Sequence, residues 1–198
     1  MLGQQAKIRT VFLLVASYYF YTQWKFEYVF LILVSTVVDY CIGQKIYKTT
    51  LLGVKKRWLL ASLFCNLGML AIFKYFSYFS GLIRGVLAKL GILYGGAGEI
   101  DLGLLLPVGI SFYTFQSMSY SIDIYLKKIQ PETNFFKFAL YVSFFPQLVA
   151  GPIERSSNLL PQFSRLYKFD YQMFVSGARL ILFGLFKKVV IADNLAVI

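Results

Sequence analysis

The apolar residues of this chain are gathered into long runs, and charged residues separate one run from the next. The runs occupy residues 10–23, 28–42, 58–73, 102–126, 135–153 and 174–186. A water-soluble domain instead alternates apolar and polar residues at helical or strand period, because each surface element needs a polar face. Long apolar runs are typical of helices in a lipid bilayer. The pattern predicts an all-α, polytopic transmembrane helical bundle, with residues 1–198 forming a single membrane domain.

The charged residues also favour a membrane over a nucleic acid as the partner of this chain. The formal net charge is +11, and 58% of the residues are hydrophobic. The basic residues lie at the ends of apolar runs and do not form one polar stripe, which excludes a nucleic-acid surface. The largest basic group separates the second and third runs: Lys45, Lys48, Lys55, Lys56 and Arg57. Lys127 and Lys128 close the fourth run, and the positive-inside rule places both groups on the cytoplasmic side.

Several boundaries of the membrane segments follow from local composition. The first two runs are shorter than the ~20 residues that span a bilayer, so they recruit neighbouring residues or lie as short helices within a larger bundle. Arg84 and Lys89 alternate with apolar residues, which predicts an interfacial amphipathic helix. Residues 95–99 read as a flexible loop, and Pro107 with Gly109 favours a bend or a helix start early in the fourth run.

The chain lacks the residues that most enzyme mechanisms and metal sites need. It contains no histidine, so no imidazole can act as a base or a ligand. Cysteine spacing does not suit a metal, and no glycine loop matches a nucleotide-phosphate fingerprint. We therefore predict no bound metal, no bound cofactor and no catalytic residue within these residues.

One face of the fourth run carries polar side chains. Gln116, Tyr120 and Asp123 follow one another at i, i+4 and i+7 and so share a helical face. Polar groups at membrane depth usually face a bundle interior or a water-filled cavity, so this face is a candidate lining for a substrate path. The alternative is that Asp123 lies at the interface and pairs with Lys127 at i+4.

The fifth run is interrupted by residues that do not suit a helix interior. Proline removes a backbone donor, and Pro146 and Pro152 bracket Gly151 directly before a charged pair. Irregular backbone at membrane depth persists only where protein buries it or where it lines an aqueous cavity. We favour a broken segment that borders a cavity, although an ordinary helix end at the interface is the alternative. The candidate cavity residues are Gln147, Gly151, Pro152, Glu154 and Arg155.

A carboxylate lies within the second run. Asp39 is flanked by Val38 and Tyr40 in apolar sequence, where an uncompensated charge is costly. Because no acid/base companion is nearby in the sequence, pairing with a basic residue of another helix is favoured over a chemical role.

Several segments together resemble one known family. They are residues 106–116 (LPVGISFYTFQ), 119–123 (SYSID), 143–147 (SFFPQ), 150–155 (AGPIER), 160–163 (LPQF) and 184–196 (GLFKKVVIADNLA). This combination resembles the membrane-bound O-acyltransferase family, in its bacterial branch of alginate O-acetyltransferase-like proteins. The resemblance implies a helical ring around a thinned membrane centre.

The resemblance also implies an activity and its partners. Members transfer an acyl group, usually acetyl, to hydroxyls of an exported polysaccharide such as alginate, often through a periplasmic acceptor protein. The implied donor is acetyl-CoA or another acyl thioester, and the implied location is the bacterial inner membrane. Members are more than twice this length and carry an essential histidine in the half expected after Ile198. The chain is thus expected to be an N-terminal part, which is inactive alone.

Two readings without enzyme activity stay open from the sequence. The first is a polytopic transporter or scaffold in which Asp39 or Asp123 couples to an ion. The second is a shorter membrane protein that acts as an assembly partner.

Overall fold

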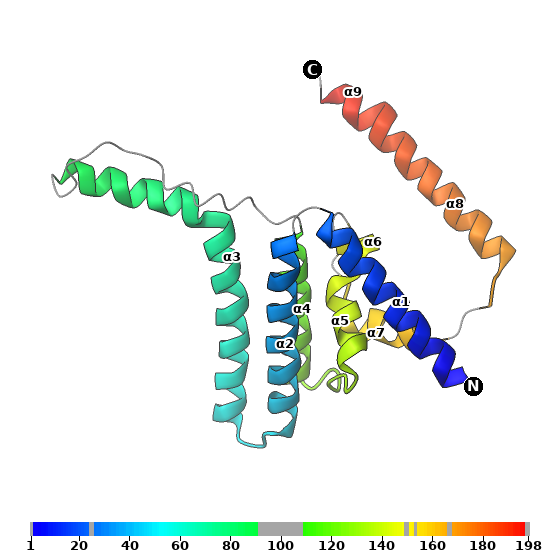
Figure 1. The fold of residues 1–198 in the computed structure, drawn as a ribbon, viewed down its shortest axis with the longest axis horizontal. Helices are drawn as coiled ribbons and strands as arrows, with labels where there is room; N and C mark the ends of the chain where they lie inside the picture. The colour runs from blue at the N-terminus through cyan, green and yellow to red at the C-terminus, as the bar shows by residue number, and fades with distance from the viewer. Residues whose placement is uncertain are drawn as a thin grey trace. The chain divides into compact units, whose positions relative to one another are not determined.

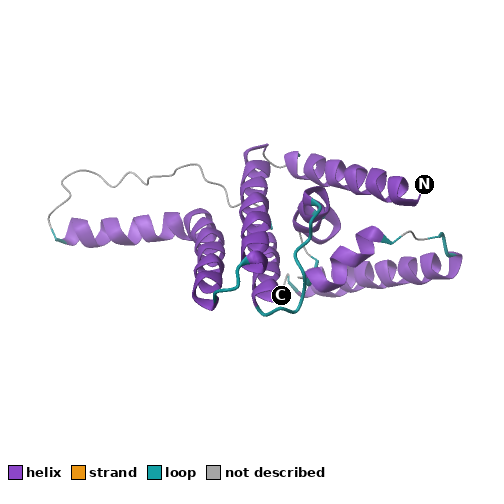
Figure 2. Cartoon of the chain, turned by 90° about the horizontal axis from the view of Figure 1, so that it is seen from below, coloured by secondary structure: helices purple, strands orange, loops and turns teal. Residues whose placement is uncertain are grey.

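A computed structural model describes residues 2–23, 26–90, 109–148, 151–152, 154–165 and 168–196. These residues form helices and connecting loops, without a strand in the described ranges (Figure 2). They fall into two compact units, Met1–Ser164 and Arg165–Ile198. The all-α prediction is confirmed, whereas a single membrane domain stays a prediction. The predicted loop at residues 95–99 and the start of the fourth run lie outside the described residues.

The first two apolar runs form helices that extend beyond the runs themselves. Helix α1 (Leu2–Thr22) has 21 residues, and α2 (Phe26–Lys48) has 23 residues. At about 1.5 Å per residue, both are long enough to cross a bilayer core. The two helices pack against each other. Of the two possibilities left open by the sequence, recruitment of neighbouring residues is the one observed.

Helix α3 (Leu52–Lys89) joins the third apolar run to the predicted interfacial segment around Arg84 and Lys89. Figure 1 shows a bend between the first part of this helix and the later part. Its first part exposes large apolar side chains: Leu60, Phe64, Leu67 and Ile72. By length and composition, Tyr28–Lys48 and Leu52–Tyr75 can each cross a membrane, and only 17% of the second span is buried by protein. So much apolar surface outside a protein core is suited to lipid, in agreement with membrane association.

Helix α4 (Ile110–Tyr125) begins and ends in unusual backbone conformations. Gly109 has a φ of 77°, and a Cβ atom there would lie 2.5 Å from the carbonyl oxygen of Leu148. Only glycine allows both, so the predicted helix start near this residue is confirmed. At the other end, the Lys127 N–H donates to the Ile124 carbonyl and the Lys128 N–H to the Asp123 carbonyl. These two bonds form a Schellman motif with Lys127 in the left-handed position.

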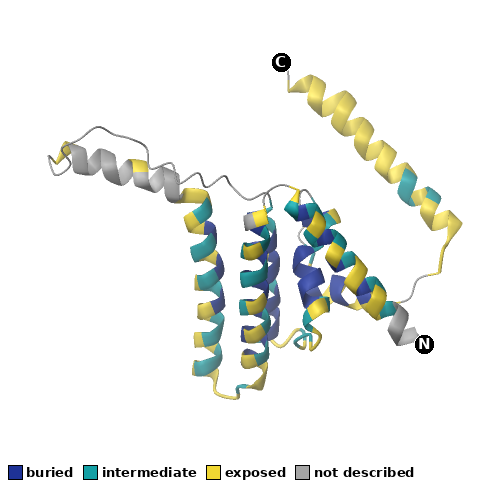
Figure 3. Cartoon of the chain, in the orientation of Figure 1, coloured by how far each residue is buried: buried dark blue, intermediate teal, exposed yellow. Residues whose placement is uncertain are grey.

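The fifth apolar run is divided between short helices, as its prolines predict. Helix α5 (Phe135–Ser143) begins at Asn134, whose side chain accepts a hydrogen bond from the Lys137 N–H. Helix α6 (Phe145–Leu148) follows after Phe144, and α7 (Ser156–Ser164) comes after the irregular segment. Figure 3 shows buried residues concentrated on α4 and α5, which form the centre of the unit Met1–Ser164.

Within the unit Arg165–Ile198, residues 171–195 form one continuous helical rod. Helix α8 (Tyr171–Phe186) continues through a π-helical segment η1 (Lys187–Ala192) into α9 (Asp193–Leu195). Asp170 caps the start by accepting hydrogen bonds from two backbone N–H groups. None of the residues in α8 is buried. Apolar side chains around the whole rod indicate lipid or protein surroundings in place of water.

Two glycines allow a direct test of helix packing. A Cβ atom at Gly43 in α2 would lie 2.9 Å from Cε1 of the buried Tyr120, whereas a Cβ atom at Gly68 in α3 meets nothing within 4 Å. We expect Gly43→Ala to lower the free energy of unfolding by about 1 kcal/mol, because overpacking outweighs the helix preference of alanine. Gly68→Ala is the matched control and should not lower it. Thermal unfolding of the intact protein in detergent compares them, and equal transition temperatures would contradict this packing.

Candidate functional site

Two buried clusters of polar side chains lie in the unit Met1–Ser164. The first, here the Asp39 cluster, joins α2, α3 and α4. Its members are Ser35, Asp39, Ser62, Asn66, Ser117 and Ser121, and each is at most 1% exposed. Polar groups this deeply buried are stable only when they are hydrogen-bonded, so their partners decide what the cluster can do.

The carboxylate of Asp39 accepts hydrogen bonds on both oxygens. Ser62 Oγ and Ser121 Oγ donate to Oδ1 at 2.5 and 3.2 Å. Asn66 Nδ2 donates to Oδ2 at 2.7 Å, and Ser117 Oγ donates to the same oxygen. The expectation of a basic partner for Asp39 is therefore wrong. Neutral donors from two neighbouring helices surround the carboxylate and replace the water that a buried charge loses.

Each of the three helices contributes its polar residues at the same spacing. The pairs are Ser35 with Asp39, Ser62 with Asn66, and Ser117 with Ser121. Residues at i and i+4 share one helix face, so each of the three helices has one polar face, and these faces are turned toward one another. Ser35 Oγ also donates to Asn66 Oδ1 at 2.8 Å, which holds the amide in place. This repeated spacing within apolar runs is the signal that could have revealed the cluster from the sequence.

The second cluster, here the glutamine cluster, consists of Gln116 on α4, Tyr141 on α5 and Gln147 on α6. Gln116 Nε2 donates to the Tyr141 carbonyl at 2.7 Å, and Gln147 Nε2 donates to Gln116 Oε1 at 2.8 Å. The Tyr141 hydroxyl lies between the carbonyls of Gln116 and Glu154, at 3.2 and 3.3 Å. These bonds join α4 to both sides of the broken segment. Sequence reasoning singled out the two glutamines but missed Tyr141, which looks like one more aromatic in an apolar helix.

The other residues of the broken segment lie at the edge of the glutamine cluster. The Gly151 N–H donates to the Gln147 carbonyl at 2.9 Å, and a Cβ atom at Gly151 would lie 2.6 Å from Cα of Gln147. The backbone can make this close approach because the residue is glycine. Pro152 and Arg155 are exposed. The Glu154 carboxylate accepts a hydrogen bond from Asn158 at 2.8 Å on the exposed side of α7.

Gln116, Tyr120 and Asp123 are all buried, so the polar face of α4 avoids lipid as predicted. The side chains of Gln116 and Tyr120 nevertheless bond to different partners. The Tyr120 hydroxyl accepts from the Glu132 N–H at 3.0 Å, away from the glutamine cluster. Asp123 is 7% exposed and forms no ion pair with Lys127. The alternative interfacial pair is thus absent, because Lys127 takes the left-handed conformation that ends the helix.

The side chains of the two clusters can donate and accept hydrogen bonds. Amide, hydroxyl and phenol groups can orient a carbonyl or hydroxyl group, but at neutral pH they are poor general bases. Within the described residues, no group of three or more histidine, cysteine, aspartate or glutamate side chains could hold a metal ion. Among the described residues, none donates a hydrogen bond to the Oε1 atom of Gln147, whose Nε2 atom is bonded to Gln116.

The glutamine cluster and the broken segment are built from the sequence segments that carry the family resemblance, and comparison with known proteins agrees. The chain is 37% identical over 197 residues to a probable alginate O-acetylase AlgI of Pseudomonas syringae, which covers 97% of this chain and 36% of that protein. It is 34% identical to the peptidoglycan O-acetyltransferase of Helicobacter pylori, over 94% of this chain and 39% of that protein. The chain is a homologue of the membrane-bound O-acyltransferases.

The homology covers only part of each relative. The AlgI protein of Pseudomonas aeruginosa is 36% identical over 96% of this chain and 36% of its own length. The chain therefore spans a little over a third of the curated relatives it matches, and it corresponds to their N-terminal part. No protein-family model and no solved structure matches the chain.

The Asp39 cluster allows a stability test. Asp39→Ala removes the acceptor of four hydrogen bonds and leaves buried donors unpaired. We expect it to lower the free energy of unfolding by about 2 to 4 kcal/mol, since interhelical bonds in membranes contribute ~0.6 kcal/mol each and unpaired donors add a further cost. Ser35→Ala, which removes only the bond to Asn66, should cost less than half of this.

Asp193→Asn is the charge-matched control, because Asp193 is exposed and pairs with Lys188 at 2.9 Å on the helical rod. Thermal unfolding of the intact protein in detergent measures all three variants. Equal stability of Asp39→Ala and Asp193→Asn would show that the Asp39 cluster does not hold the helices together.

Proposed function

We propose that the intact protein is a membrane-bound O-acyltransferase that transfers an acyl group, which we take to be acetyl, to hydroxyls of an exported polysaccharide. The observation that carries the proposal is identity of 34 to 37% over nearly the whole chain to proteins named for O-acetylation of alginate and of peptidoglycan. Both named substrates are polysaccharides, so a sugar hydroxyl is the common acceptor chemistry. The histidine that assists transfer is expected in the part of the protein that follows this chain.

We place the path of the acyl group beside the broken segment between α5 and α7. Non-helical backbone at membrane depth needs burial in protein or a cavity, and here the glutamine cluster ties that backbone to α4. The Oε1 of Gln147, to which no described residue donates a hydrogen bond, can accept one from a donor or acceptor substrate. The proposed lining is completed by neighbours on α4 and on the broken segment: Gln116, Tyr120, Asp123, Gly151, Pro152, Glu154 and Arg155.

The proposal includes a donor, an acceptor and a location. The donor is acetyl-CoA or another acyl thioester that reaches the protein from the cytoplasm. A periplasmic acceptor protein passes the acyl group to the polysaccharide, and the protein crosses the bacterial inner membrane several times. Support for this location comes from the two apolar spans and from the basic residues gathered at the end of the first and the start of the second.

The transporter alternative has less support at Asp39, one of its two candidate ion sites with Asp123. Both oxygens of Asp39 are taken by neutral donors from α3 and α4. An ion that coupled to this carboxylate would have to displace several of those bonds.

Deletion of the gene tests the proposed activity. We expect the exported polysaccharide of the source cell to lose its ester-linked acetyl groups, and the intact gene supplied in trans to restore them. Alkaline release of acetate from the purified polymer measures the ester content. An unchanged acetate content after deletion, in a strain whose undeleted parent expresses the protein, would exclude polysaccharide O-acetylation.

The position of the acyl path has its own test. Gln147→Leu keeps the approximate volume of the side chain and removes its hydrogen bond to Gln116 and the proposed bond to substrate. A hydrogen bond contributes about 1 to 1.5 kcal/mol, so loss of the bond to substrate should lower acetylation about tenfold. Gln162→Leu is the matched control, because Gln162 is exposed on α7. Acetate per polymer, normalised to the amount of protein in the membrane, gives the comparison. Equal activity of the two variants would remove Gln147 from the path.

A further inference from the structure

One end of the unit Met1–Ser164 carries a dense group of basic side chains. The members, here the basic end, are Lys48, Lys55, Lys56, Arg57, Lys127 and Lys128. They come from the end of α2, the start of α3 and the end of α4. These ends lie together, because Gly43 of α2 is in contact with Tyr120 and Ile124 of α4. All except Lys55, which is half-buried, are exposed.

The acidic residues at this end do not neutralise the basic end. Glu132 pairs with Lys137 at 2.7 Å and also accepts a hydrogen bond from the Asn134 N–H. Asp123 is buried beneath the loop that follows α4. No residue of the basic end forms an ion pair with another described residue. Lys45 is not counted in the group because it has a partner of its own, with its Nζ atom 4.1 Å from the centre of the Trp58 ring.

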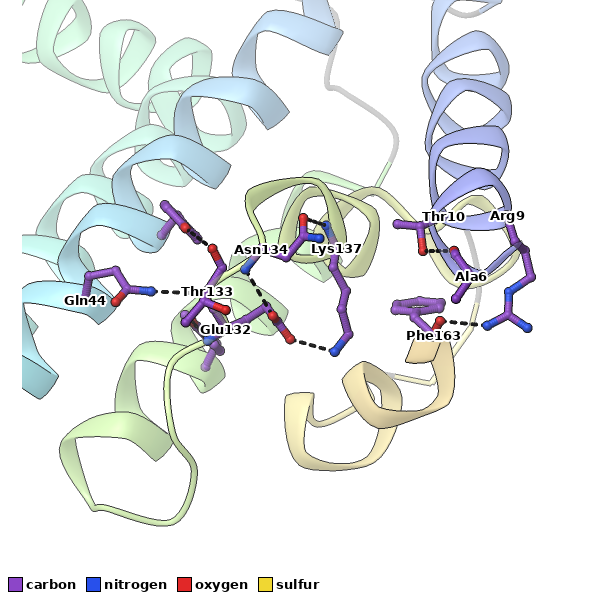
Figure 4. A network of polar contacts seen from close by, with 11 residues as sticks. Ala6, Arg9, Thr10, Gln44, Glu132, Thr133, Asn134, Lys137 and Phe163 are labelled. Atoms are coloured by element: carbon purple, nitrogen blue, oxygen red, sulfur yellow. Dashed lines mark hydrogen bonds and ion pairs between the residues drawn. The ribbon is translucent and has the colours of Figure 1, made fainter. Parts of the chain in front are cut away.

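The loop that carries Lys127 and Lys128 is fixed by hydrogen bonds from α2 and α4. Gln44 Nε2 donates to the Glu132 carbonyl at 2.8 Å, and the Tyr40 hydroxyl donates to the Thr133 carbonyl at 2.6 Å. The Glu132 N–H donates to the Tyr120 hydroxyl. Figure 4 shows Gln44, Thr133 and the paired Glu132 and Lys137 around this loop. The two lysines are therefore presented on a preformed surface, which reduces the entropy cost of binding.

The conformation of Lys127 adds a further observation. Its φ of 59° is the left-handed value that glycine adopts at helix ends without steric cost. Lysine at this position costs stability and places an additional exposed ammonium group beside Lys128. The chain thus carries a charge at the helix end where an uncharged glycine would be more stable.

From these observations we propose that the basic end binds the phosphate headgroups of anionic phospholipids. It lies at the ends of the two segments that can cross a membrane, Tyr28–Lys48 and Leu52–Tyr75, and so at the level of the headgroups. Lysine ammonium groups bind phosphate as point charges, and each basic residue near an anionic surface adds to the attraction. The inference concerns lipid selectivity and does not depend on the proposed acyl transfer.

The test compares lipid binding by the intact protein and by charge variants. Spin-labelled phosphatidylglycerol and phosphatidylcholine are the probes, in bilayers reconstituted with the protein. We expect the wild type to select phosphatidylglycerol, and Lys48→Gln/Lys127→Gln/Lys128→Gln to lower that selectivity about tenfold. The control, Lys7→Gln/Lys168→Gln/Arg179→Gln, loses the same charge at exposed residues outside the basic end and should retain wild-type selectivity.

A single substitution separates lipid binding from a general loss of structure. Lys127→Gly relieves the left-handed conformation, so we expect its thermal transition to rise while its selectivity for phosphatidylglycerol falls. Wild-type selectivity in the triple variant, or an equal loss in the control, would overturn the proposal. Coenzyme A also carries phosphates, and binding of coenzyme A to the basic end without selectivity for phosphatidylglycerol would overturn it too.

Discussion

The hydrogen-bonded carboxylate of Asp39 is the interaction on which the arrangement of α2, α3 and α4 depends. In a lipid bilayer, apolar side chains gain little by moving from lipid to a neighbouring helix, so small residues and polar bonds decide which helices associate. Asp39 receives donors from α3 and α4 at once, and an isolated carboxylate at this depth would be costly. Gly43 lets α4 approach α2 closely enough for those bonds to form.

The same bonds set the rotation of α4 and thereby the position of the glutamine cluster. Ser117 and Ser121 face Asp39, and Gln116 precedes Ser117 in the chain. One residue along a helix turns the side chain by about 100°, so Gln116 points to a different neighbour, α5, and bonds to Tyr141 and Gln147. A rotation of α4 that preserved one cluster would break the other. The broken segment is therefore held by a helix whose own register is fixed by Asp39.

Local sequence features predicted the local features of this structure. The apolar runs, the helix start at Gly109 and the interruption after Ser143 each follow from residues close together in the chain. The partners of Asp39 did not follow, because serine and asparagine in an apolar run carry no sign of which helix they will meet. The alternative contact of Asp123 with Lys127 is absent for a related reason. It assumed a continued helix, whereas the backbone reverses its handedness at Lys127.

Charged and uncharged groups lie in different parts of the unit Met1–Ser164. The two polar clusters lie in the interior, and a dense group of exposed charges lies at the basic end. The only carboxylate in the Asp39 cluster is fully bonded, and the glutamine cluster is neutral. An interior of this kind can orient an uncharged acyl ester or a hydroxyl without the desolvation cost that a charged group would meet. The phosphate groups of anionic phospholipids instead find their partners at the basic end under the lipid-binding proposal. Under the proposed acyl transfer, this region therefore orients substrates, and the general base belongs to another part of the protein.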